Sequence, residues 1–418
     1  MSAERRYISS VLLLAMFLLV SARLRGQEEA SPDKVFAAVP FDRWVQQGAV
    51  TEIPWKVRIT PLGLTVYQRL RARIDVELEG RDLLKFPAGD RLAVLVQVSD
   101  AAGRKFREYQ ITTLKELPHF NKTRLDVYWN LFVVPGEYQV TLAVVETVKG
   151  RHSLMQAPMR VEPLKNDLLP GSWEGLPTVE FLTTGLREPD VFFHPDATGR
   201  LHLPLQSRRD VRLEVLADVT ASDLFRGSTA FYNRYLAVAL PLLKSLSQVT
   251  VERGSLDVAM LDLRKRAVTF EQDDVKALDW PKARSALAPE TGPSTIDIKE
   301  LEKRRESPAF LQDELLRRLT AAPADQPRGD DPAHVFVIIG SPMDFYSFRN
   351  LPHLPPGSEE KCVVYYLQFE LLNTTYANGA VGNVRKMLAP LPVHVFKVRS
   401  AESVRYALAK ILNEVKNM

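Results

Sequence analysis

A cluster of oxygen-bearing side chains directly follows an apolar segment of the chain. The segment LEVLADVTASDL, residues 213–224, places Asp218, Thr220 and Ser222 at alternate positions after a run of hydrophobic residues. One carboxylate and two hydroxyls in a tight loop can all turn inward and offer the hard oxygen ligands that Mg²⁺ binds in octahedral geometry. The same side chains can instead end a strand, bind loop amides and cap the helix that follows. Both interpretations stay open at this point.

Sequence signatures of enzymes are absent. The chain has no GxSxG, no Gly-rich phosphate loop, no HExxH and no CxxC, and its seven histidines are dispersed. The carboxylate pairs Asp273-Asp274 and Asp330-Asp331 are adjacent in sequence, which is typical of solvated loops rather than of an acid/base pair. We therefore expect a protein that is not an enzyme, and a carboxylate hydrolase is the least favoured alternative.

The elements that must position the oxygen cluster alternate between strand and helix. Apolar runs such as LEVLA, HVFVIIG and CVVYYLQF are separated by segments with helical periodicity, and LDVAMLDL with AVTFEQ indicates a hairpin. Continuous apolar strands between helices are typical of a parallel sheet covered on both faces. The sequence thus predicts an α/β doubly wound, mostly parallel sheet over residues 206–418.

The oxygen cluster also carries a family resemblance. Asp218-Val-Thr220-Ala-Ser222 resembles the DxSxS motif of the von Willebrand factor type A (VWA) domain, and the order of expected elements over residues 206–418 resembles that family as well. In the family the motif supplies part of a metal-ion-dependent adhesion site. The resemblance implies that TGPSTI contributes Thr295 to the metal shell from a second loop.

The third loop departs from the family pattern. After the strand HVFVII the family places an Asp, whereas this chain has Ser341, with Asp344 three residues further on. The loss of one carboxylate lowers the charge of the site, so weaker cation affinity is expected. The resemblance implies a degenerate site for Mg²⁺ or Mn²⁺ made by Asp218, Thr220, Ser222, Thr295 and Ser341, all converging where parallel strands end.

In the preceding half of the chain, hydrophobic residues recur at every second position. Residues 35–161 hold several short alternating strands, among them LRARIDVEL and EYQVTLAVVE, separated by turn residues. Such a pattern predicts an antiparallel β-sandwich-like domain. Residues 162–205 contain scattered prolines that are incompatible with long helices, and we expect an extended Pro-rich connector there.

The N-terminus and the cysteine content predict export. Residues 1–26 combine a basic start with the apolar run VLLLAMFLLV and small residues at 21 and 22, which is typical of a signal peptide. Contact with a membrane is expected only through this segment, if it is not cleaved. The single cysteine, Cys362, permits no intrachain disulfide, which favours a bacterial protein that is periplasmic or extracellular.

These observations lead to two hypotheses of function. The first is an exported protein-binding or adhesion-type module that engages another, unidentified protein through the degenerate metal site. The alternative is a metal-free structural scaffold subunit of a cell-envelope complex. Nucleic acid is not an expected partner, because removing residues 1–26, which carry a net charge of +3, reduces the total from +4 to +1.

Overall fold

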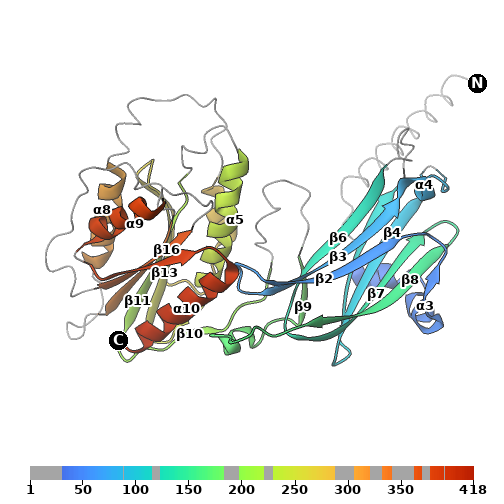
Figure 1. Cartoon of the computed structure of the whole chain (residues 1–418), viewed down its shortest axis with the longest axis horizontal. Coiled ribbons are helices and arrows are strands. Elements are labelled where there is room, and N and C mark those ends of the chain that lie inside the picture. Colours follow the sequence, from blue (N-terminus) through green and yellow to red (C-terminus); the bar gives the residue numbers. More distant parts are fainter. Residues whose placement is uncertain are drawn as a thin grey trace, which may run out of the picture. The chain divides into compact units, whose positions relative to one another are not determined.

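The computed structural model describes ten stretches of the chain (Figure 1): residues 31–87, 89–114, 123–182, 197–220, 229–287, 306–320, 332–340, 362–369, 377–389 and 391–418. The expected export signal, residues 1–26, lies outside these stretches. The chain divides into two compact units. The first comprises Met1–Arg58, Asp75–Tyr128 and Glu137–Arg160, and the second comprises Ile59–Ile74, Trp129–Gly136 and Val161–Met418. The domain boundaries expected from the sequence stay a prediction.

Two sheets occupy the part of the chain before residue 183. One has the strand order β1-β8-β7-β4-β5 and the other β2-β3-β6-β9. The pairs β1–β8, β4–β5, β4–β7 and β6–β9 are antiparallel. The strands are β1 (Val50–Thr51), β2 (Lys56–Leu64), β3 (Leu70–Glu79), β4 (Arg91–Asp100), β5 (Lys105–Thr113), β6 (Arg124–Val133), β7 (Gly136–Glu146), β8 (His152–Val161) and β9 (Val179–Leu182).

The alternation of residue types in β3 determines which of its faces is buried. Leu70, Ala72, Ile74, Val76 and Leu78 are each at most 2% exposed, and the residues between them are partly exposed. Side chains along a strand point to opposite faces in turn, so this pattern buries one complete face. The short helices of this region are α2 (Pro32–Ala37), α3 (Phe41–Gln47), α4 (Gly80–Leu83) and the 3-10 turn η2 (Pro170–Trp173).

The C-terminal region contains a six-stranded sheet with the order β14-β13-β11-β15-β16-β17. The pairs β11–β13, β11–β15, β15–β16 and β16–β17 are parallel, and β13–β14 is antiparallel. Its strands are β11 (Val211–Asp218), β13 (Gly254–Asp262), β14 (Ala267–Gln272), β15 (Ala333–Gly340), β16 (Cys362–Phe369) and β17 (Val393–Val398). A separate parallel pair joins β10 (Leu203–Leu205) and β12 (Val249–Val251).

Two apolar clusters hold helices against this sheet. One contains Val215 and Ala217 of β11 together with residues of α5 (Thr229–Leu246) and α10 (Ala401–Lys416). The other contains Leu216 together with residues of α8 (Ser307–Thr320) and α9 (Ala377–Leu388). A further short helix, α6, spans Trp280–Ser285. Among the described helices, none is long and apolar enough to cross a membrane.

The fold class expected from the sequence does not hold for the chain. A doubly wound, mostly parallel sheet was expected to define the C-terminal half, but all described strands except β10 and β12 belong to antiparallel or mixed sheets. The C-terminal sheet is itself mixed, because β14 runs antiparallel to β13 at its edge. The physical reason for the error is that an apolar run shows burial of a strand without fixing the direction of its neighbour.

Helix α10 is fastened to two distant segments within the second unit. Arg405 donates from Nε to Asp167 Oδ1 at 2.5 Å and from Nη2 to Ser172 Oγ at 2.9 Å, and its guanidinium lies 4.7 Å from the Trp173 ring centroid. Gln68, in the turn between β2 and β3, donates from Nε2 to the carbonyl of Ala401 at 3.1 Å. These bonds tie residues 68 and 167–173 to the last helix of the chain.

Candidate functional site

Asp218 and Thr220 meet at the end of the central strand β11. Both side chains are buried, with exposed fractions of 2% and 5%. Asp218 Oδ1 accepts a hydrogen bond from the Thr220 amide at 3.0 Å and a second from the Thr220 hydroxyl at 2.5 Å. A carboxylate two residues before a hydroxyl bonds locally in this way when the chain turns sharply after a strand. The orientation of the carboxylate is therefore set by the residues that follow it.

The hydroxyl of Thr220 also connects β11 to the neighbouring strand. Its oxygen accepts a hydrogen bond from the Leu263 amide at 2.7 Å, and the Val219 amide donates to the Leu261 carbonyl at 2.8 Å. A hydroxyl offers one donor and two acceptor lone pairs. Because the donor and one lone pair of Thr220 are engaged, a single lone pair is left for any further ligand.

The end of β15 approaches the same point. A Cβ atom added at Gly340, the last residue of β15, would lie 3.6 Å from Asp218 Cβ and 2.9 Å from the hydroxyl oxygen of Tyr366 in β16. The carboxyl ends of β11, β15 and β16 therefore lie side by side, as parallel strands of one sheet require. Gly340 leaves no room for a side chain between Asp218 and Tyr366.

The expected metal-binding set is only partly within the described residues. Asp218 and Thr220 are brought together, whereas Ser222, Thr295 and Ser341 lie outside the described ranges, as does Asp344. Their participation stays a prediction. Within the described ranges, no group of three or more His, Cys, Asp or Glu side chains could hold a metal ion. Asp218 and Thr220 fit part of a Mg²⁺ shell, which prefers six oxygens.

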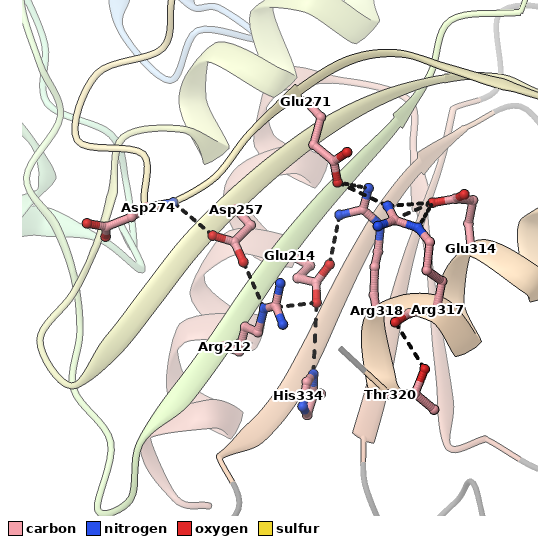
Figure 2. A network of polar contacts seen from close by, with 10 residues as sticks. All are labelled: Arg212, Glu214, Asp257, Glu271, Asp274, Glu314, Arg317, Arg318, Thr320 and His334. Carbon is pink, nitrogen blue, oxygen red and sulfur yellow. Dashed lines mark hydrogen bonds and ion pairs between the residues drawn. The ribbon is translucent and has the colours of Figure 1, made fainter. Parts of the chain in front are cut away.

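A buried ionic cluster lies in the same sheet around Glu214 of β11, and Figure 2 shows its polar contacts. Glu214 of β11 accepts a hydrogen bond from Nη1 of Arg318 in α8 at 3.0 Å, and Arg318 Nη2 donates to Glu271 of β14 at 2.5 Å. Arg212 donates from Nε to Asp257 of β13 at 2.8 Å. The side chains of Glu214 and Arg318 are 0% and 2% exposed. The pairs of Arg318 fasten α8 to β11 and β14, and the pair of Arg212 with Asp257 joins β11 to β13.

The electrostatics of this cluster favour an ionised Glu214. Burial alone would raise the pKa of Glu214, but His334, Arg318 and Arg212 more than offset that effect and lower it. His334 Nδ1 lies 3.9 Å from Glu214 Oε1, which is too long for a hydrogen bond. The cluster is suited to holding elements together, since its charges are paired with one another.

Sequence reasoning missed this cluster. Glu214 lies inside the apolar strand LEVLA, and Arg318 lies 104 residues further along in LLRRL. The available signal was the single charge within an otherwise apolar strand, because a buried carboxylate needs a charged or hydrogen-bonding partner. The sequence gives no indication of which arginine that partner is.

Comparisons with known proteins identify no family. No protein-family profile matches the chain, and no curated protein matches it in sequence. Solved structures that resemble it include the PilB minor pilin of Streptococcus sanguinis, with 9% identity over 77% of this chain and 87% of the pilin at a TM-score of 0.26. The VWA2 paralog of ArnB from Sulfolobus acidocaldarius is 8% identical over 66% of this chain at a TM-score of 0.21. This chain covers half of that paralog's length, 50%.

The pilus adhesin SpaC from Lactobacillus rhamnosus GG is also similar, with 9% identity, a TM-score of 0.27 and coverage of 68% of this chain and 34% of SpaC. TM-scores at this level support no conclusion about the fold or the function of this chain. Function has to be argued from the site itself.

Proposed function

We propose that the chain is an exported, non-enzymatic protein-binding module of adhesion type, and that it engages its partner through the strand ends around Asp218 and Thr220. The observation that carries the proposal is the buried Asp218 carboxylate, held in one orientation by the amide and hydroxyl of Thr220 at the end of a central strand. A carboxylate oriented in this way is suited to bind a cation or a donor group of a partner without reorganisation.

A divalent cation would strengthen this function in one specific way. The segment from Asp218 to Ser222 resembles the DxSxS motif, whose oxygens bind Mg²⁺ or Mn²⁺. A cation held there with an open coordination position would accept a carboxylate of the partner protein. Weak affinity is expected, because Ser341 stands where the family pattern has an Asp. The segment 1–26 supports export, which would place the partner in the periplasm or outside the cell.

The first test measures cation binding to the full chain by thermal unfolding. Binding to the folded state alone raises stability by RT ln(1 + [L]/Kd), so a weak site gives a measurable shift only at high cation concentration. We expect Mg²⁺ or Mn²⁺ to raise the melting temperature of the wild type and of Asp274→Ala, an exposed control, but not of Asp218→Ala. Ser341→Asp is expected to enlarge the shift.

The second test measures partner capture from a bacterial envelope extract. We expect the protein captured by the wild type and by Asp274→Ala to be lost with Asp218→Ala and in the presence of a chelator. Capture that survives both the chelator and Asp218→Ala would contradict binding through the strand ends.

A metal-free scaffold is the second candidate function. The observation that favours it is the double use of the Thr220 hydroxyl, which donates to Asp218 and accepts from Leu263 with protein groups alone. In this case Asp218 and Thr220 join β11 to β13 and contact no partner. The expected result is then no response of the melting temperature to cations in the wild type or in Ser341→Asp, together with a large loss of stability in Asp218→Ala.

A further inference from the structure

A row of arginines lies along one face of β3. Arg71 and Arg73 alternate with the buried Leu70, Ala72 and Ile74, and Arg69 lies in the bend directly before the strand. Side chains two residues apart on a strand point to the same face, so Arg71 and Arg73 share the face opposite the buried residues of β3. All of these residues belong to the second compact unit.

Arg69 is buried and pairs with the carboxylate of Glu180. Its side chain is 4% exposed, its guanidinium lies 4.5 Å from the ring centroid of Phe132, and its Nη1 pairs with Glu180. Phe132 and Glu180 face each other across the β6–β9 pair. The Glu180 carboxylate also accepts bonds from the Thr198 hydroxyl at 2.9 Å and from the Gly199 amide at 3.2 Å. Its negative charge is thus shared among several donors.

Several N–H groups of the arginine row have no acceptor within the described parts of the chain. They are Nε and Nη2 of Arg69 and Nε of Arg71, all of them buried. Burial lowers the pKa of Arg71, and the like charge of Arg73 lowers it further. A buried guanidinium donor without an acceptor is costly, since the group loses its water and gains nothing in exchange. Arg69 and Arg71 therefore have more buried donors than the described parts of the chain satisfy.

We propose that Arg71, which is partly exposed, binds a carboxylate group supplied by an acidic side chain of a partner protein, and that the buried charge of Arg69 supports this contact. Arginine presents its donors in a planar fork that matches the two oxygens of a carboxylate, and the partly exposed guanidinium of Arg71 offers such a fork. The positive charge of Arg73 adds a favourable field on the same face. None of these residues belongs to the strand-end site, so this contact goes beyond the function proposed above and its test is independent of Asp218.

The test uses the full chain and a fluorescently labelled hexaglutamate peptide, with hexaglutamine as the uncharged peptide. Fluorescence anisotropy at low salt is expected to show binding of hexaglutamate only. Arg71→Gln is expected to weaken binding about tenfold or more, because it removes charge-assisted hydrogen bonds. Arg71→Lys, which keeps the charge and loses the fork, is expected to give an intermediate affinity. Arg81→Gln, which removes the charge of a 75% exposed arginine on α4, should leave binding unchanged.

A variant with the opposite effect separates binding from folding. Glu180→Gln removes the negative charge that competes for Arg69 while keeping the size of the side chain, so it is expected to strengthen hexaglutamate binding. Loss of folded protein cannot produce a gain in affinity, and circular dichroism of each variant checks its folding. Excess acetate is expected to displace the peptide only at far higher concentration than the peptide itself, since it offers one carboxylate.

Three results would overturn the proposal. Equal loss of affinity in Arg71→Gln and Arg81→Gln would show a general effect of charge. Acetate binding as tightly as hexaglutamate would identify a small-molecule site in place of a protein contact. Absence of hexaglutamate binding, combined with a lower melting temperature of Arg71→Gln, would show that the arginines are satisfied within the chain itself.

Discussion

Arg318 Nη1 lies 3.0 Å from Glu214 Oε2, and this ion pair is buried between β11 and α8. Removal of one partner leaves the other charge buried without compensation, which costs about 3–5 kcal/mol in comparable pairs. We expect Arg318→Met to lower the free energy of unfolding by about this amount in urea titrations. Arg317→Met is the matched control, because Arg317 pairs with the same Glu271 and Glu314 but is half exposed, and a cost of about 0–1 kcal/mol is expected. Equal costs for the two variants would contradict the importance of the buried pair.

The same pair predicts how stability depends on pH. The pKa of Glu214 is lower in the folded protein than its ordinary value, because His334, Arg318 and Arg212 outweigh the effect of burial. Folding is therefore favoured by the ionised Glu214 above that ordinary value, and this contribution is lost as the pH falls toward the folded-state pKa. Melting temperatures should be measured from pH 7 to pH 3. The wild type is expected to melt at a higher temperature than Glu214→Gln at pH 7, and this difference should shrink in the acidic range. If the wild type instead became more stable relative to Glu214→Gln as the pH falls, the pKa of Glu214 would be raised by folding, and the prediction would be wrong.

Thr220 offers a test of the strand-end geometry that involves no metal. Thr220→Val keeps the shape of the side chain but removes the hydroxyl that donates to Asp218 and accepts from the Leu263 amide. Leaving buried polar groups without partners costs about 1–3 kcal/mol, so a loss of this size is expected in chelator. Thr220→Ser keeps the hydroxyl and is expected to retain most of the stability. If valine and serine are equally tolerated, the hydroxyl does not join the two strands in the way described.

Substitution of Arg405 tests whether residues before 206 contribute to the stability of the second unit. It binds Asp167, the Leu169 carbonyl and Ser172, all of which precede residue 206. Arg405→Gln is expected to destabilise the full chain by about 3 kcal/mol or more, because it breaks a buried ion pair. In a fragment of residues 206–418 the same substitution should have little effect, since its partners are missing. Similar losses in both chains, measured by urea unfolding, would show that the fragment is complete without them.

Local patterns in the sequence predicted local structure well. The alternation in residues 70–78 predicted β3 and its buried face, because the period of a strand is a property of the backbone. Asp218 and Thr220 were recognised as a pair of oxygens at a strand end, but their role stayed open, since a metal shell and a hydrogen-bonded turn require the same residue types. The hydrogen bonds between Asp218 and Thr220 depend on how the chain turns after β11. The spacing of residues in the sequence does not determine that turn.

Contacts between distant residues could not be predicted. Glu214 and Arg318 are separated by 104 residues, and Arg69 and Glu180 by 111. Periodicity reports whether one segment is buried and does not report which segment covers it. The expected fold class was wrong for the same reason, because a mixed sheet and a parallel sheet present similarly apolar strands.

The bond from Gln68 to the carbonyl of Ala401 spans 333 positions of the chain. A ribosome releases the turn at residue 68 long before it makes α10, so this turn must wait for its partner while the intervening chain emerges. Contacts of such high sequence separation slow folding, because the loop must close before the contact contributes any stability. The bond between Gln68 and Ala401 therefore forms only after α10 has been synthesised, so this part of the second unit is completed late in folding.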